Sequence, residues 1–255
     1  MNAVKVRNIT IGEGMPKICV PIVGKTKEEI LAAAQEILEV PADLVEWRAD
    51  WFESVFEIEK VKKLLAQLRD MLDDKPLLFT FRTKAEGGEK EISFEQYRKL
   101  LQDVAGIGHA DMIDVETFWE GHASDMGDFI KGLQRSGVKV VGSNHDFVKT
   151  PDKAEILRRL CHMQEIGVDI PKIAVMPQTP NDVLTLLDAT SEMRNRYANR
   201  PIITMSMGTL GAVSRISGEI FGSSVTFGTV TQASAPGQIE AKQLKNMMEI
   251  LHPTQ

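Results

Sequence analysis

A single lysine interrupts an apolar stretch at residues 170–177, which read IPKIAVMP. Side chains alternate along a β-strand, so Lys172 is expected to point to the face opposite Ile173 and Val175. The apolar neighbours favour a buried strand, and a lysine on an exposed strand is the alternative. An amine that is removed from water becomes a nucleophile toward a carbonyl carbon. The sequence therefore predicts that Lys172 forms an imine with a carbonyl substrate.

One histidine is placed where it could move protons. His145 is one of five histidines and the only one at the end of a predicted strand. An adjacent carboxylate, Glu86 or Glu116, could orient the ring as a general acid and base near neutral pH. A metal site with Glu46, Glu116 and Asp146 is the alternative. It is disfavoured because such centres need two or three imidazoles and because nearby arginines would repel a cation, so we predict no metal.

Three arginines fall at predicted strand ends or in the following loops, namely Arg48, Arg82 and Arg215. Guanidinium groups present paired donors to planar oxyanions, so these residues suit a carboxylate or a phosphate. The chain has no P-loop and no glycine-rich phosphate cradle after its last two predicted strands, which favours a carboxylate. Taken singly, each arginine could instead form an ion pair with Glu46, Asp50 or Glu86.

Strand-like and helix-like runs alternate along the chain, with eight of each. The predicted strands cover residues 17–24, 43–50, 76–83, 112–118, 139–147, 170–177, 201–208 and 224–230. Alternating βα units imply parallel strands, and eight of them in one chain of 255 residues predict a closed (β/α)₈ barrel, a TIM barrel, as a single domain over residues 1–255. An open doubly wound sheet is the alternative, but no G-x-G-x-x-G motif follows the first strand.

Local signals predict where several helices begin. Capping boxes place starts at Thr26 with Glu29 and at Ser93 with Gln96. Thr-Pro pairs at 150–151 and 179–180 predict two more, since proline suits the first helical position. The last helix is expected to carry Ile239, Leu244, Met247, Met248 and Leu251. Ahead of the barrel, residues 4–6 and 9–11 predict a short β-ribbon.

Several predicted strands have one apolar face and one polar face. The polar faces carry Glu46, Arg48, Asp50, Thr80, Arg82, Asp114, Glu116, Ser143, His145, Thr204 and Ser206. A barrel interior near the carboxyl ends of the strands is where such groups could satisfy one another. The strand ends and following loops would then gather one charged pocket from Glu46, Arg48, Arg82, Glu86, Glu116, His145, Lys172, Arg215, Ser234 and Gln238.

Composition excludes some classes of partner. The formal net charge is −6 and no local basic patch is present, which argues against nucleic acid and anionic membranes. No window approaches the roughly 20 apolar residues of a membrane helix, and residues 1–10 lack a signal-peptide core, so a cytoplasmic location is expected. Cys19 and Cys161 have no disulfide or metal spacing and are expected to be reduced packing residues.

Six blocks of sequence together resemble one family, type I 3-dehydroquinate dehydratase. The blocks are EWR with Asp50, FRT with EGG at 86–88, SNHDF at 143–147, KIAVMP at 172–177, SMG at 206–208 with Gly211 and Ser214-Arg215, and SAPGQ at 234–238. The resemblance runs from about residue 17 to the C-terminus. It implies a lyase of the shikimate pathway of aromatic amino-acid biosynthesis, with no metal or organic cofactor.

The resemblance also implies residue roles. Lys172 would form the Schiff base with the C3 ketone of 3-dehydroquinate, His145 would move the C2 proton to the departing C1 hydroxyl, and Glu86 would orient the histidine. Arg215 would hold the substrate carboxylate. The remaining positions would line the ring hydroxyls or close over the site, namely Glu46, Arg48, Arg82, Ser234 and Gln238. Some members carry a serine near Pro21, and proline cannot supply that hydroxyl.

Two other functions stay open from the residues themselves. A Schiff-base aldolase would share the barrel and the lysine, although it often handles phosphorylated substrates. A non-catalytic barrel that binds a carboxylate would use Lys172 and His145 only as pocket charges. The family resemblance further implies a homodimer.

Overall fold

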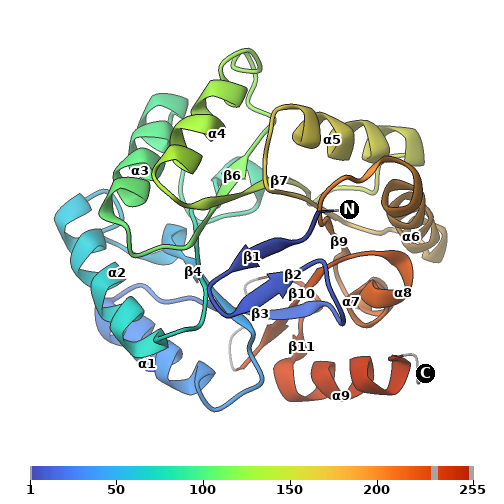
Figure 1. The fold of residues 1–255 in the computed structure, drawn as a ribbon, viewed down its shortest axis with the longest axis horizontal. Helices are drawn as coiled ribbons and strands as arrows, with labels where there is room; N and C mark the ends of the chain where they lie inside the picture. Colours follow the sequence, from blue (N-terminus) through green and yellow to red (C-terminus); the bar gives the residue numbers. More distant parts are fainter. Residues whose placement is uncertain (1, 231–234, 253–255) are drawn as a thin grey trace.

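The computed structural model describes residues 2–230 and 235–252. Within them, nine strands form one parallel sheet in the order β11-β10-β3-β4-β5-β6-β7-β8-β9. The sheet curls into a barrel that closes where the backbone N–H of Ser224 donates to the carbonyl of Ile202 at 2.8 Å. Figure 1 shows the helices arranged as a ring around the strands. The predicted (β/α)₈ barrel is confirmed.

The strands are β1 (Val4–Val6), β2 (Ile9–Ile11), β3 (Lys17–Ile22), β4 (Leu44–Arg48), β5 (Leu77–Thr80), β6 (Met112–Glu116), β7 (Lys139–Asp146), β8 (Ile170–Val175), β9 (Ile203–Ser206), β10 (Val225–Thr229) and β11 (Ile239–Glu240). The α-helices are α1 (Lys27–Ile37), α2 (Ile58–Leu72), α3 (Phe94–Ile107), α4 (Met126–Arg135), α5 (Lys153–Glu165), α6 (Pro180–Glu192), α7 (Ala212–Ile216), α8 (Gly218–Phe221) and α9 (Ala241–Leu251). Short 3₁₀ turns η1 (Ala49–Trp51) and η2 (Lys84–Glu86) follow β4 and β5, and the π-helical turn η3 (Met193–Tyr197) extends α6. None of the helices described is long and apolar enough to cross a membrane.

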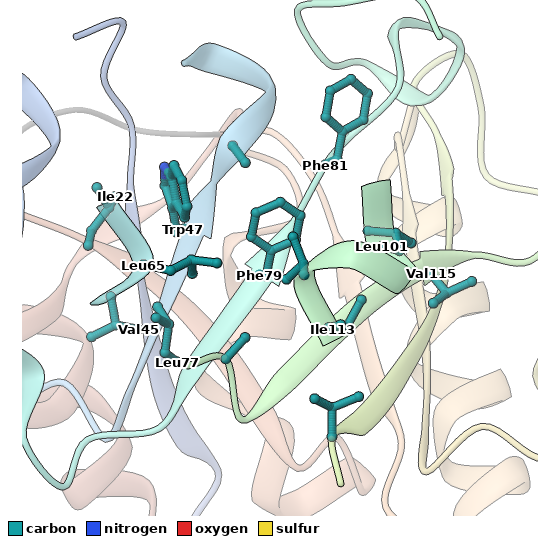
Figure 2. Close-up of a cluster of buried hydrophobic side chains, with 14 of the residues drawn as sticks. Ile22, Val45, Trp47, Leu65, Leu77, Phe79, Phe81, Leu101, Ile113 and Val115 are labelled. Carbon is teal, nitrogen blue, oxygen red and sulfur yellow. The ribbon is translucent and has the colours of Figure 1, made fainter. Parts of the chain in front are cut away.

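Two apolar layers hold the barrel together. The outer layer lies between strands and helices, and Figure 2 shows part of it, where Trp47, Phe79 and Ile113 of the strands meet Leu65 of α2 and Leu101 of α3. The inner layer lies inside the barrel, from Met205 and Met207 to its amino-terminal end. The predicted ribbon, β1 paired with β2, contributes Val6 and Ile11 to that inner layer and lies across this end (Figure 1). The charged side chains that face inward lie toward the other end, at the carboxyl ends of the strands.

Helix starts follow the predicted caps with one exception. Thr26 and Ser93 form the predicted capping boxes, and Thr179 caps α6 with Pro180 in its first turn. The predicted start at 150–151 is wrong, because Asp152 caps α5 by accepting a hydrogen bond from the backbone N–H of Glu155 at 2.8 Å.

The prediction for the last helix is also partly wrong. Ile239 lies in β11, where it pairs with Gly228, and α9 begins only at Ala241. Leu244 and Met248 are buried, whereas Met247 and Leu251 are 40% and 38% exposed. The helix therefore buries a narrower stripe than the apolar residues in its sequence indicate.

Thr204 and Ser206 do not join the barrel interior, which corrects the sequence prediction for this strand. The Thr204 hydroxyl is hydrogen-bonded to the hydroxyl of Thr190 on α6 at 2.7 Å, and the Ser214 hydroxyl accepts from the backbone N–H of Ser206 at 2.9 Å. Met205 and Met207 occupy the inward positions instead. The Ser206 hydroxyl is buried and has no hydrogen-bond partner among the described residues. Hydroxyls on this strand face the helices whether or not a helix supplies a partner, so polarity alone does not identify the inward face.

Candidate active site

A cavity opens at the carboxyl ends of the strands, where barrels of this kind place their active sites. Among the described residues, it is lined by the predicted site residues Glu46, Arg48, Arg82, Glu86, His145, Lys172 and Gln238. Arg215 does not line the cavity but bonds to its wall, and Ser234 lies outside the described residues. Glu116 of β6, which the sequence also placed in this pocket, does not line the cavity but contacts Arg82 of its wall.

Lys172 extends from β8 into this cavity and is only 3% exposed. Its Nζ lies 3.4 Å from Oδ2 of Asp114, 3.9 Å from Oε1 of Glu46 and 4.5 Å from the centre of the Phe227 ring. The carboxylates and the ring face all stabilise a positive charge at this nitrogen. An iminium carries that charge, so the surroundings suit a lysine that becomes a protonated imine.

His145 and Glu86 form a directly bonded pair. Oε2 of Glu86 lies 2.9 Å from the ring Nδ1 of His145 and also accepts the backbone N–H of His145 at 2.9 Å. Burial and the positive charges of Arg82, Lys172 and Arg48 lower the pKa of His145 well below its usual value. The imidazole is therefore uncharged near neutral pH, which is the form that a general base requires.

Arg82 lies at the centre of a buried ionic network. Its guanidinium contacts Oδ1 of Asp114 at 2.8 Å, Oε1 of Glu116 at 2.9 Å and Oγ of Ser143 at 3.0 Å. Burial lowers the pKa of Arg82, but Asp114, Glu116 and Glu86 outweigh it and raise that pKa overall. Arg82 is therefore paired with carboxylates of the protein. This agrees with the alternative that each arginine forms an ion pair within the chain.

Arg48 also has a protein partner. It forms two parallel hydrogen bonds to Asp50, from Nε at 2.8 Å and from Nη2 at 2.9 Å. Asp50, which follows β4 in η1, accepts the backbone N–H of Arg82 as well, at 3.3 Å. Arg48 and Arg82 are therefore held rigidly against the cavity wall rather than left free to fold over a ligand.

Arg215 on α7 differs from the other two arginines. It is 1% exposed, and its described hydrogen bonds go to backbone carbonyls, from Nη2 to Pro236 at 3.0 Å and from Nη1 to Phe227 at 3.5 Å. Its Nε is buried and has no hydrogen-bond partner among the described residues. Burial lowers the pKa of Arg215 to about 10. Among the described residues, no carboxylate is hydrogen-bonded to this buried cation, so Arg215 is suited to bind an anionic ligand.

Asp114 is a site residue that was not predicted from the sequence, although the strand pattern placed it on a polar face. Asp114 is fully buried and joins Lys172 to Arg82, with a further hydrogen bond of 2.6 Å from Ser143. Arg82 and Lys172 lower the pKa of Asp114 despite its burial, so it stays charged. The sequence feature that could have identified Asp114 is its position two residues before Glu116, on the same face of the predicted strand.

Comparison with known proteins decides the family. A family model described as Type I 3-dehydroquinase matches residues 18–255. The chain belongs to this family. It is 53% identical over 249 residues to 3-dehydroquinate dehydratase of Clostridioides difficile, covering 98% of this chain and 97% of that protein. It is 52% identical over 252 residues to the enzyme of the same name from Syntrophotalea carbinolica, covering 99% of each.

Solved structures of the family have the same fold as this type I 3-dehydroquinase. A crystal structure of Type I 3-dehydroquinate dehydratase from Clostridium difficile, with covalent modified comenic acid, aligns with a TM-score of 0.94 at 52% identity over 98% of each chain. The enzyme of Geobacillus kaustophilus aligns with a TM-score of 0.94 at 39% identity, covering 98% of this chain and 96% of that one. The predicted family and its barrel are confirmed.

Proposed function

We propose that this chain dehydrates 3-dehydroquinate to 3-dehydroshikimate in the shikimate pathway, and that residues 1–255 act as one catalytic domain. The observation that carries the proposal is the buried Lys172 in the same cavity as the bonded pair of His145 and Glu86. An amine for the ketone and a base for the neighbouring proton are the groups that this reaction needs.

The reaction can be written with these residues. Nζ of Lys172 adds to the C3 ketone carbon, and loss of one water gives an iminium next to Asp114. His145 removes a proton from C2 to give an enamine. The enamine electrons then expel the C1 hydroxyl, which takes that proton from His145 and leaves as water. A further water hydrolyses the iminium, so that one water is released overall and Lys172 is regenerated.

The remaining site residues have supporting roles in the proposal. Glu86 orients His145, and Arg215 holds the substrate carboxylate. Glu46, Arg48, Arg82 and Gln238 line the cavity around the ring hydroxyls, and Ser234 is proposed to contact substrate on the ground of the sequence resemblance alone. The proposed chemistry needs neither a metal nor an organic cofactor, since lysine supplies the electron sink.

The direct test is to mix the purified protein with 3-dehydroquinate and follow the absorbance of the conjugated enone in the product. Growth of that absorbance at catalytic protein concentration supports the proposal. A Schiff-base aldolase would instead split the carbon skeleton, which mass analysis of the products would detect. A binding barrel would leave the substrate unchanged and would show only saturable binding.

Arg215→Ala is expected to weaken substrate binding more than turnover. Loss of a paired contact to a buried carboxylate costs on the order of 2 kcal/mol or more, which is about thirtyfold in affinity. KM should therefore rise about thirtyfold while kcat changes less. Arg196→Ala is the control, because Arg196 is exposed and pairs only on the surface with Glu192. Equal KM values for Arg215→Ala and Arg196→Ala would contradict the role of Arg215.

We also propose that the chain is cytoplasmic and that it forms a homodimer, the second of which the family resemblance implies. Exposed apolar side chains gather on α7, α8, α9 and the turn before α7, namely Leu210, Val213, Ile220, Met247, Ile250 and Leu251. α7 contacts both α8 and α9, and the three helices lie together at the lower right of Figure 1. A contiguous exposed apolar surface is typical of a protein interface.

Sedimentation equilibrium should give twice the chain mass of 28.4 kDa for the parent protein. Ile250→Lys, at a position that is 82% exposed, should shift the mass toward the monomer because a charge would be buried in the interface. Val148→Lys, at a position that is 77% exposed and outside these helices, should leave the dimer intact. A monomeric parent would contradict the dimer.

A further inference from the structure

A chain of polar side chains runs from the outer surface of α5 to His145. Nη1 of Arg159 donates to Oδ1 of Asn144 at 2.8 Å, and Nδ2 of Asn144 donates to Oε1 of Glu86 at 3.0 Å. The other oxygen of Glu86 holds His145, as described above. At the outer end, Nε of Arg159 pairs with Oε1 of Glu155 at 2.7 Å. Neither Asn144 nor Arg159 lines the cavity.

Arg159 determines which end of the Asn144 amide faces Glu86. A guanidinium has only donors, so it must meet the amide oxygen, and the amide NH₂ is then left to face Oε1 of Glu86. Without Arg159, the amide could turn about its terminal bond and present its oxygen to Glu86. The NH₂ group stabilises an ionised carboxylate, whereas the oxygen would accept a proton from a neutral carboxylic acid.

The charge of Glu86 in turn selects the tautomer of His145. An ionised Glu86 accepts a hydrogen from Nδ1, which leaves the lone pair on Nε2 to remove a proton from substrate. A protonated Glu86 would donate to Nδ1, so that the ring hydrogen would sit on Nε2 and the base would be lost. Asn144 and Arg159 therefore influence the reaction without touching substrate.

We propose that Asn144 and Arg159 are positioning residues that favour the ionised form of Glu86 and thereby favour the tautomer of His145 that can accept a proton. The inference deepens the proposed function, because it rests on His145 being the base. It adds two residues to those that support the reaction, Asn144 on β7 and Arg159 on α5, which act on His145 through Glu86.

Glu86 is sensitive to small changes around it. Burial and then the nearby charge of Glu116 raise the pKa of Glu86 to about 8, with a smaller contribution from Asp114. Arg82, 3.5 Å away, and the hydrogen bond from Asn144 oppose that rise. On its remaining side Glu86 meets His145. At a pH below this pKa, each unit by which loss of the Asn144 hydrogen bond raises the pKa of Glu86 lowers its ionised fraction about tenfold.

The test compares Arg159→Met, Asn144→Ala, the double variant and Arg158→Met. In each, kcat/KM for 3-dehydroquinate is measured against pH. Arg158 is the matched control, because it is next to Arg159 in the sequence and also pairs with Glu155, at 2.6 Å. Its side chain is 60% exposed. Arg159→Met and Asn144→Ala should each move the rising limb of the profile upward by about one pH unit and lower kcat/KM at pH 7 about tenfold.

Two features distinguish this positioning role from a structural role. The deficit should narrow as pH rises, because Glu86 ionises in the variants too. The double variant should be no worse than Asn144→Ala, because Arg159 acts through Asn144. A deficit that is constant over pH, additive effects in the double variant, or an equal effect of Arg158→Met would each overturn the proposal.

A second measurement does not depend on turnover. ¹⁵N spectra of labelled histidine in the protein without substrate report which ring nitrogen of His145 carries hydrogen. At a pH above the pKa of Glu86 the parent should carry it on Nδ1, and Arg159→Met should increase the share on Nε2 at the same pH. An unchanged tautomer would refute the positioning role even if the dehydratase activity were present. A parent that does not turn over 3-dehydroquinate would refute only the proposed function.

Discussion

Lys172→Met should lower turnover of 3-dehydroquinate by at least about 10⁴-fold, because removal of the nucleophile from a covalent mechanism typically costs several orders of magnitude. Methionine keeps the length and most of the volume of the side chain but has no amine. The fold should survive the change, since Asp114 would still be held by Arg82 at 2.8 Å and by Ser143 at 2.6 Å. The measurement is steady-state kinetics together with thermal unfolding of the variant.

Lys139→Met provides the control for that experiment. Lys139 begins the neighbouring strand β7 and pairs with Asp169 at 3.5 Å on a partly exposed surface. It should keep parent activity, because surface pairs of this kind contribute little. If Lys172→Met retained full activity while remaining folded, the amine would have no covalent role.

His145→Ala should accept substrate covalently but fail to complete the reaction. Imine formation needs the amine of Lys172, whereas removal of the C2 proton needs a base in hydrogen-bond reach, which contributes roughly 10² to 10⁴ in rate. Turnover should therefore fall by that factor while a borohydride-reducible intermediate accumulates. Rapid mixing with borohydride and intact-protein mass analysis would measure the accumulated fraction.

His162→Ala is the matched histidine variant, since His162 lies on α5 against Phe118 and outside the cavity. It should turn over at the parent rate without accumulating an intermediate. Near-parent turnover in His145→Ala would transfer the role of base to Glu86 or Glu116, and the assignment of roles would then be wrong.

The sequence predicted the barrel because its signals are local and repeat eight times. Each unit combines a short apolar strand with an amphipathic helix, and parallel strands need such crossovers. The inward direction of Lys172 could also be predicted, because side chains alternate along a strand and Ile173 and Val175 face the helices. Local signals failed where two caps competed, since Asp152 and not the preceding Thr-Pro pair begins α5.

The contacts between strands could not be predicted in the same way. The Asp114 link between Lys172 and Arg82 joins three strands or their ends, and depends on a register that no local pattern specifies. Thr204 satisfies its hydroxyl on α6, and Asn144 reaches Glu86 from the strand position next to His145. Such side-chain partners depend on how the strands pack against one another and against the helices. Composition and hydrophobic periodicity do not predict that packing.

The central claim is that Lys172 bonds covalently to 3-dehydroquinate during the reaction. The most direct measurement is to add borohydride to the parent protein during turnover, digest it and locate the modified peptide by mass spectrometry. The account predicts one reduced adduct, on Lys172, with loss of activity in proportion to labelling. An adduct on a different lysine, or continued turnover with no adduct and no inactivation, would contradict it.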